Sequence, residues 1–311
     1  MRYRLFGRTG LRVSELFLGA MRFGSVDQAR PIIDLYAGSG GNVIDTADAY
    51  GGSEDIVGEV LAGRRDRFVL ASKYSLPRDP ADINAAGNHR KNLRLALESS
   101  LRRLRTDHLD IYWVHFWDRH TPIEETLRAL DDAVRAGKIL YAGISDAPSW
   151  IVARANTLAE WHDWTEFAGL QVPYSLLQRD IERELLPMAE AFGLTVAAWA
   201  PLAHGKLGRS ADTAVDEREH KVLVAVQEVA RELGATPAQV ALAWTRAHSR
   251  AVHPLAGASS PAQLADNLAA LELELPGEAV GRLESATDFE LGFPRDFLTD
   301  DFLGPHQLDG R

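Results

Sequence analysis

Cysteine is absent from this chain of 311 residues. Its absence excludes disulfides, thiol nucleophiles, zinc ribbons and iron–sulfur clusters, because each of them needs cysteine sulfur. A chain without disulfides is typical of a reducing compartment, so we expect a cytoplasmic protein. Any redox chemistry would have to depend on a bound cofactor.

Positive charge and long apolar segments are also scarce. The 34 Lys and Arg residues are outnumbered by 44 Asp and Glu, and the formal net charge of −10 disfavours nucleic acids and anionic membranes as partners. Apolar segments such as Val196–Ala203 are far shorter than the roughly 20 residues that cross a bilayer. The first ten residues lack the apolar core of a secretory signal, so we expect no export.

Eight short apolar segments recur along the chain and predict β-strands. They are near-continuous runs rich in Val, Ile and aromatic residues, which is typical of parallel strands covered on both faces. The segments are Leu16–Ala20, Asn42–Ala47, Phe68–Lys73, Leu109–His115, Leu140–Ser145, Ala168–Val172, Thr195–Ala200 and Ala251–Gly257.

Helical patterns separate these segments and carry start and stop signals. Thr121 and Ser260 each precede a proline and predict helix N-caps, and Gly137 and Gly193 follow the ends of two helices. The expected helices are Asp27–Gly38, Ser53–Ala62, His89–Leu104, Pro122–Ala136, Ser149–Glu160, Ile181–Ala191, two between Glu217 and Ala247, and Pro261–Leu271.

Repeated β-then-α units of this length close most simply as a (β/α)8 barrel. An open doubly wound sheet is the alternative, but it predicts a glycine-rich turn after the first strand, where this chain has Met-Arg-Phe-Gly. We therefore predict a single α/β domain over residues 1–311, a (β/α)8 TIM barrel with extra helices. Residues 1–15 would form an N-terminal hairpin, and residues 272–311 a C-terminal tail over the barrel.

Polar residues at the carboxyl ends of the predicted strands form the candidate site, because barrel enzymes carry their chemistry there. Asp45, Tyr50, Lys73 and His115 follow three successive strands and can converge. A lysine cation favours a nearby phenolate, a carboxylate would hold that lysine, and an imidazole could donate to a carbonyl oxygen. Together these groups would protonate an alkoxide. No metal site is expected, because H-x-H and H-E-x-x-H patterns are missing.

Six segments together resemble the signatures of the aldo-keto reductase superfamily. Their order and spacing carry the resemblance, which covers about residues 3 to 271, whereas any one segment alone would be weak. The glycine-alanine-serine pattern near residue 257 is closest to the bacterial and potassium-channel-beta-like branch. The six segments are Tyr3–Ser14, Asn42–Glu54, Ala71–Tyr74, Asp110–His115, Gly137–Ser145 and Gly257–Asn267.

The resemblance implies an NADP-dependent alcohol dehydrogenase or carbonyl reductase, in which a hydride from NADPH reduces an aldehyde or ketone to an alcohol. Tyr50 would be the general acid, Lys73 and Asp45 would tune it, and His115 would place the carbonyl. Further residues would bind the cofactor by the same resemblance: Ser145, Asp146 and Gln171 at the carboxamide, Trp199 on the nicotinamide ring, and Gly19, Met21, Leu202, Gly205, Lys206, Arg209, Gly257, Ser259, Gln263, Asp266 and Asn267 elsewhere.

Two positions depart from the commonest family pattern. Asp146 stands where asparagine is usual, and an ionised carboxylate accepts hydrogen bonds without donating any. No cation lies near Gly257 to meet a 2′-phosphate, so that role would fall to Ser259 with Arg209 or Lys206. The missing cation weakens the case for NADPH, yet the resemblance still leaves NADH as the less favoured cofactor. A capping box explains Gln263 without any ligand.

Aromatic residues near the strand ends suggest the substrate. We expect Phe23, Tyr74 and Trp117, with Trp199, to line a pocket for aromatic or apolar small-molecule carbonyls. The alternative is an NADPH-binding regulatory or redox-sensing subunit with little turnover. A metal-dependent barrel hydrolase is a third reading, and it would require bound metal.

Overall fold

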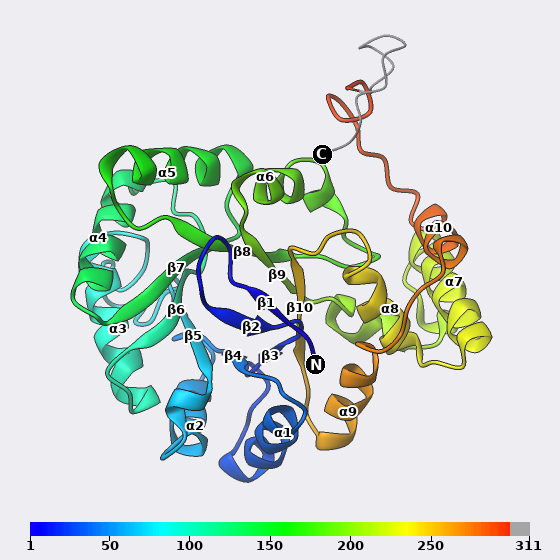
Figure 1. The fold of residues 1–311 in the computed structure, drawn as a ribbon, viewed down its shortest axis with the longest axis horizontal. Helices are drawn as coiled ribbons and strands as arrows, with labels where there is room; N and C mark the ends of the chain where they lie inside the picture. Colours follow the sequence, from blue (N-terminus) through cyan, green and yellow to red (C-terminus); the bar gives the residue numbers. More distant parts are fainter. Residues whose placement is uncertain (299–311) are drawn as a thin grey trace.

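A computed structural model describes residues 1–298 and contains eight parallel strands closed into a barrel (Figure 1). The order around the barrel is β10-β3-β4-β5-β6-β7-β8-β9, so neighbours in the chain are neighbours in the sheet. Each strand overlaps one of the eight predicted segments, and the predicted (β/α)8 barrel is confirmed. The strands are β3 Phe17–Gly19, β4 Val43–Asp45, β5 Val69–Tyr74, β6 Leu109–Val114, β7 Ile139–Ser145, β8 Phe167–Pro173, β9 Thr195–Trp199 and β10 Val252–Gly257.

Helices surround the barrel on its outer face (Figure 1). Within residues 1–298, no helix combines the length and the hydropathy that a membrane span requires. The α-helices are α1 Val26–Gly38, α2 Ser53–Val60, α3 Arg90–Leu104, α4 Ile123–Arg135, α5 Ser149–His162, α6 Leu185–Phe192, α7 Glu217–Leu233, α8 Pro237–Thr245, α9 Pro261–Ala269 and α10 Gly277–Ser285, and the 3-10 helices are η1 Arg65–Arg67, η2 Asp180–Glu182, η3 Ala203–Gly208 and η4 Ala211–Thr213.

Two helix starts differ from the prediction. Ser260 does cap α9, but Thr121 does not cap α4, because Pro122 is extended (φ −54°, ψ 133°) and the helix begins one residue later. The Thr121 hydroxyl instead donates to the Asp118 carboxylate at 2.6 Å. The helix predicted from residue 181 is broken at Glu184 (φ −143°, ψ −41°) into η2 and α6.

The predicted C-terminal tail contains a helix that the sequence patterns did not indicate. Helix α10 packs beside α7, and Arg282 forms an ion pair with Glu232 between them (Figure 1). Residues 299–311 of the predicted tail lie outside the described residues. The placement of the tail over the barrel therefore stays a prediction.

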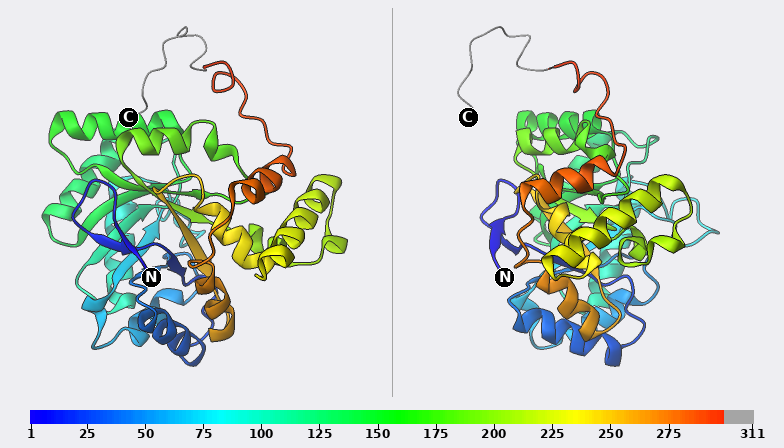
Figure 2. Two further views of the ribbon diagram at one scale, coloured as in Figure 1. Left: turned by 45° about the vertical axis from the view of Figure 1, so that its right-hand side comes forward. Right: turned by 90° about the vertical axis from the view of Figure 1, so that its right-hand side faces the viewer.

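An antiparallel hairpin closes one end of the barrel. Strands β1 (Tyr3–Leu5) and β2 (Arg12–Ser14) pair with each other, and the right-hand view of Figure 2 shows them, in dark blue, at one edge of the molecule. The Gly7 amide donates to Thr195 Oγ1, at the start of β9, at 2.8 Å. The hairpin therefore lies at the amino ends of the strands and leaves the carboxyl ends open.

Side chains of one parity on each strand fill the barrel interior. Phe17, Val43, Ala71, Ile111 and Trp113 pack there against Phe6 of the hairpin. The ring of Trp113 occupies the space that Cβ atoms would need at positions 143 and 169, where the chain has glycine. Since successive strand residues alternate between faces, the residues two positions beyond this layer also point inward, at the open mouth.

Candidate active site

A buried ion pair forms the floor of the open end. Lys73, two residues beyond the interior Ala71, is fully buried, and its ammonium donates to Asp45 Oδ1 and to the Thr46 carbonyl at 2.8 Å. Burial alone would lower the pKa of Lys73, but the adjacent Asp45 carboxylate and Tyr50 together raise that pKa above its usual range. Lys73 is therefore a permanent cation at the bottom of the site.

Tyr50 lies directly above this cation. Its loop between β4 and α2 turns at Gly51 and Gly52, both with positive φ, and brings the phenol oxygen to 3.3 Å from Lys73 Nζ. Burial raises the pKa of the phenol, and the Lys73 charge opposes that shift without reversing it. Tyr50 therefore holds its proton at neutral pH, beside a cation that would stabilise the phenolate.

His115 completes the predicted set of four. Its ring meets that of Tyr50 edge to face, with 5.7 Å between centroids and an interplanar angle of 80°. Burial, together with the nearby Lys73 charge, lowers the pKa of His115 to about 3. The imidazole is therefore neutral and has one N–H to donate.

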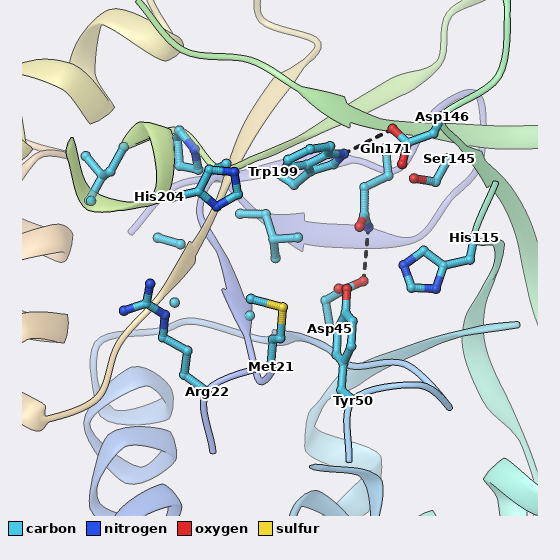
Figure 3. A pocket seen from close by; sticks show the side chains of 18 of the residues that line it. Met21, Arg22, Asp45, Tyr50, His115, Ser145, Asp146, Gln171, Trp199 and His204 are labelled. Atoms are coloured by element: carbon cyan, nitrogen blue, oxygen red, sulfur yellow. Dashed lines mark hydrogen bonds between the residues drawn. The ribbon is translucent and has the colours of Figure 1, made fainter. Parts of the chain in front are cut away.

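These groups open into a cleft of about 370 Å³ at the mouth of the barrel (Figure 3). The volume lies within the range of small-molecule sites. Thirteen of the residues that sequence analysis assigned to catalysis or cofactor binding line it: Gly19, Met21, Asp45, Tyr50, His115, Ser145, Asp146, Gln171, Trp199, Leu202, Gly205, Gly257 and Gln263.

One wall of the cleft fits a primary carboxamide. Gln171 donates through Nε2 to Asp45 Oδ2 at 3.1 Å, and because that carboxylate only accepts, the Gln171 carbonyl oxygen is left as an acceptor. Ser145 adds a hydroxyl and Asp146 adds carboxylate oxygens on the same wall. An amide needs one donor for its oxygen and acceptors for its NH2, and this set supplies both.

Trp199 forms the adjoining wall at the end of β9. Its indole Nε1 donates to Asp146 Oδ1 at 3.2 Å, and its ring lies 6.1 Å from that of His204 (Figure 3). A flat ring beside the carboxamide-binding groups is a suitable surface for stacking a heteroaromatic ring. The cleft residues therefore fit a nicotinamide.

Several predicted cofactor residues are placed outside the cleft wall. Lys206 is held by Glu219 at 2.7 Å, and Arg209 is exposed and does not line the cleft. Asp266 accepts hydrogen bonds from side chains of α8 and its cap, and Asn267 is buried and donates to the Gly257 carbonyl at 3.3 Å. These two have structural roles within the described residues.

Ser259 and Gln263 form a local pair next to the α9 N-terminus. Both the amide and the hydroxyl of Ser259 donate to Gln263 Oε1, at 2.8 and 3.0 Å, while the Gln263 amide is capped by Ser260. The Gln263 side chain thus turns back to residue 259, outside the helix, instead of to the cap residue as in a capping box. Gln263 also lines the cleft.

None of the three predicted substrate residues is among those that line the cleft. Phe23 and Tyr74 are buried between the strands and the helices, and Tyr74 stacks on Tyr112 at 5.2 Å. Tyr74 points away from the barrel interior because side chains alternate along a strand and its neighbour Lys73 points inward. Trp117 is partly exposed and contacts Trp150 edge to face at 5.7 Å.

Sequence reasoning missed Arg22, His204 and Trp150. Among the described residues, Arg22 is the one Arg or Lys that lines the cleft, and His204 lines it with a left-handed backbone (φ 59°) (Figure 3). Trp150 is 57% exposed at the start of α5. The available signal was position, since each follows the carboxyl end of a barrel strand by a few residues.

Metal ligands do not gather in the described part of the chain. Within residues 1–298, no group of three or more His, Asp or Glu side chains is arranged to hold a metal ion.

Comparison with known proteins agrees with this geometry. The model of the aldo/keto reductase family matches residues 15–288. The norsolorinic acid reductase stcV of Emericella nidulans is 38% identical over an alignment that covers 96% of this chain and 84% of that protein. The putative aryl-alcohol dehydrogenase AAD14 of Saccharomyces cerevisiae is 34% identical over 96% of this chain and 90% of that protein. Both relatives carry the names of oxidoreductases, and this chain belongs to the aldo/keto reductase family.

Proposed function

We propose that this protein reduces an aldehyde or ketone to an alcohol with a nicotinamide cofactor, NADPH in preference to NADH. The observation that carries the proposal is the 3.3 Å contact between the Tyr50 hydroxyl and the buried Lys73 ammonium at the floor of the cleft. A protonated phenol beside a fixed cation is a general acid whose conjugate base is stabilised in advance. The oxidoreductase names of the relatives support the same reaction class.

Each polar group of the floor would have its own role. Tyr50 would donate its proton to the carbonyl oxygen as negative charge develops there, and Lys73 would stabilise the phenolate that remains. Asp45 keeps Lys73 charged and in place through their ion pair. The neutral His115 would donate a hydrogen bond to the same oxygen and orient the carbonyl. When bound, the reduced nicotinamide would supply the hydride.

The wall residues would hold the cofactor. Ser145, Asp146 and Gln171 would bind the carboxamide, and Trp199 would lie against the ring. Arg22 supports the choice of NADPH, because it brings a positive charge into the cleft where Lys206 and Arg209 do not. The α9 N-terminus, with Gly257, Ser259 and Gln263, would receive the adenosine end.

A pair of aromatic residues close to His115 in the sequence would favour aromatic substrates. Trp117 follows His115 by two residues, and its edge-to-face contact with the exposed Trp150 would make an apolar surface near the catalytic groups. Aromatic side chains present large contact area at low entropic cost. The relatives named for norsolorinic acid and for aryl alcohols agree with this preference.

Tyr50→Phe tests the acid. We expect it to leave the dissociation constant for NADPH within about twofold and to lower turnover by roughly 10²–10⁴, the usual contribution of general acid–base catalysis. Tyr3→Phe is the matched control, since Tyr3 lies in the hairpin at the opposite end of the barrel and should keep full activity. Wild-type turnover is measured as NADPH oxidation with a panel of aromatic and aliphatic carbonyls.

Two outcomes would contradict the proposal. Full activity in Tyr50→Phe would remove the phenol from the mechanism. Tight NADPH binding by the wild-type protein with negligible turnover across the whole panel would instead indicate a cofactor-binding regulatory subunit.

A further inference from the structure

We propose that Asp146 is a positioning residue that fixes the plane of the Trp199 indole within the cofactor wall. The inference rests on the proposed function, because the ring would be fixed for the nicotinamide. It adds a role to a carboxylate whose other oxygen stays available to a carboxamide.

The hydrogen bond between these residues joins two strands that are not neighbours. Asp146 follows the last residue of β7 and Trp199 is the last residue of β9, while β8 lies between them. Their side chains meet above this intervening strand, where Trp199 Nε1 donates to Asp146 Oδ1 at 3.2 Å (Figure 3). The bond therefore bridges the mouth of the barrel over Gln171.

An indole has one hydrogen-bond donor, so this single bond sets its orientation. Turning the ring over about its Cβ–Cγ bond would carry Nε1 away from Asp146 and leave the donor without this partner. The aromatic ring that contacts the indole among the described residues, that of His204, is tilted by 53° at 6.1 Å and supplies no parallel surface for it. The carboxylate is thus the group that selects one ring orientation.

The backbone at residue 146 aims the carboxylate at this donor. Asp146 has a φ of 48°, in the left-handed region, which aspartate adopts more readily than most non-glycine residues. Its amide donates to the Gln171 carbonyl at 3.2 Å, which anchors the residue to β8. A left-handed conformation at the edge of a binding cleft is typical of functional sites.

A carboxylate suits this place better than an amide would. Desolvation raises the pKa of Asp146, and the hydrogen bond from Trp199 opposes that shift. Both carboxylate oxygens accept, so one can bind the indole while the other faces an NH2 group. An asparagine could accept from the indole with its oxygen, but it would then present a second donor to the carboxamide.

The first arm of the test needs no cofactor. In the free protein, the Trp199 indole N–H resonance is identified by its loss in Trp199→Phe, and its hydrogen exchange with solvent is measured. We expect exchange to become at least threefold faster in Asp146→Ala and to stay near the wild-type rate in Asp146→Asn, which keeps an acceptor. Asp34→Ala, which removes an exposed carboxylate of α1 bonded to Arg64, is the control and should change nothing. Equal exchange in wild type and Asp146→Ala would overturn the proposal.

The second arm asks whether the bond acts on the cofactor through the ring. Dissociation constants for NADPH are measured for wild type, Asp146→Ala, Trp199→Phe and the double variant. We expect the loss of affinity caused by Asp146→Ala to be at least threefold smaller in the Trp199→Phe background, because the partner is already gone. If the fold-losses of NADPH affinity in the two single variants multiply in the double variant, Asp146 acts independently of Trp199. That result would overturn its positioning role.

The two arms separate this inference from the proposed function. A wild-type protein that binds no nicotinamide cofactor would end the proposed function and, with it, the positioning role, whatever the exchange rates. A wild-type protein that binds NADPH but shows multiplicative losses would end the positioning role alone.

Discussion

The Lys73 ammonium touches Tyr50 in two ways, at 3.3 Å from the phenol oxygen and at 4.7 Å from the ring centroid. The first contact favours the phenolate, and the second is a cation–π interaction that also holds the ring over the cation. Both depend on Asp45, which shares the buried ammonium. The Lys73 ammonium therefore affects both the stability of the folded protein and the acidity of Tyr50.

Removing Lys73 should expose that coupling. Lys73→Met leaves the Asp45 carboxylate buried without its cation, and losing one partner of a buried pair costs about 3–5 kcal/mol of unfolding free energy. We expect the double variant Asp45→Asn/Lys73→Met to recover most of this stability in urea unfolding, because no charge is then left buried. Activity should stay low in both variants. A double variant as unstable as Lys73→Met alone would mean that the ion pair is not the source of the loss.

Asp48 should make stability depend on pH. Its carboxyl is buried, and neither oxygen has a hydrogen-bond partner in the described structure. Burial, with the Glu54 charge adding to it, raises the Asp48 pKa from 3.8 to about 7, while Arg78, Arg103 and Lys73 act in the opposite direction. The folded protein thus binds a proton there that the unfolded chain has released, so this contribution to stability is full below about pH 4 and is lost as the pH rises through 7.

Asp48→Asn is the measurement that follows. At pH 8 the variant should be more stable than wild type by about 1–4 kcal/mol, the upper value being three pKa units converted at 1.36 kcal/mol each. The difference should shrink toward zero near pH 4. The amide can still accept from Arg78, which lies 3.7 Å from the carboxylate. Urea unfolding at both pH values checks this, and a difference independent of pH would refute it.

Much of the fold could be predicted because parallel barrel strands are buried on both faces. Each strand is therefore a continuous apolar run in the sequence. The absence of a glycine-rich turn after the first strand distinguished the closed barrel from the open doubly wound sheet. Helix α10 was not predicted because its sequence contains Gly277 and Gly281, which weaken helix propensity, and because Pro276 supplies no side-chain cap. The start of α4 was misjudged since Thr121 prefers to bond Asp118.

The site shows where sequence reasoning reaches its limit. Asp45, Lys73 and His115 lie at or next to the carboxyl ends of their strands, so strand ends alone placed them together. Whether the other residues reach the cleft depends on the direction of their side chains. Tyr74 could have been assigned to the outer layer from its neighbour Lys73, by alternation. Arg22 follows a strand end, but that position alone does not show that its side chain faces the cleft, because a loop residue's direction depends on how the loop packs.

Arg22 should contribute to cofactor affinity. Its guanidinium faces the cleft and forms no hydrogen bond or ion pair with the rest of the described chain. Hydrogen bonds to charged groups contribute about 1.5–3 kcal/mol, so Arg22→Gln should weaken NADPH binding by roughly tenfold or more. Arg209→Gln, outside the cleft, is the control. Parallel titrations with NADH identify the phosphate, since a smaller effect on NADH assigns Arg22 to the 2′-phosphate and an equal effect assigns it to the diphosphate. Unchanged affinity for both would remove Arg22 from the site.

Trp150 should select for aromatic substrates without affecting the chemistry. If its contact with Trp117 forms the proposed aromatic surface for the substrate, Trp150→Ala should raise KM for benzaldehyde-type carbonyls by about 5- to 15-fold, equivalent to about 1–1.5 kcal/mol for an aromatic pair. KM for a short aliphatic aldehyde, and kcat for both, should change little. Trp161→Ala is a matched control, because Trp161 is 79% exposed on the same helix, near its opposite end, and so lies toward the closed end of the barrel. An equal rise of KM for both substrate types would show that Trp150 supports the structure of the rim and does not recognise the aromatic ring.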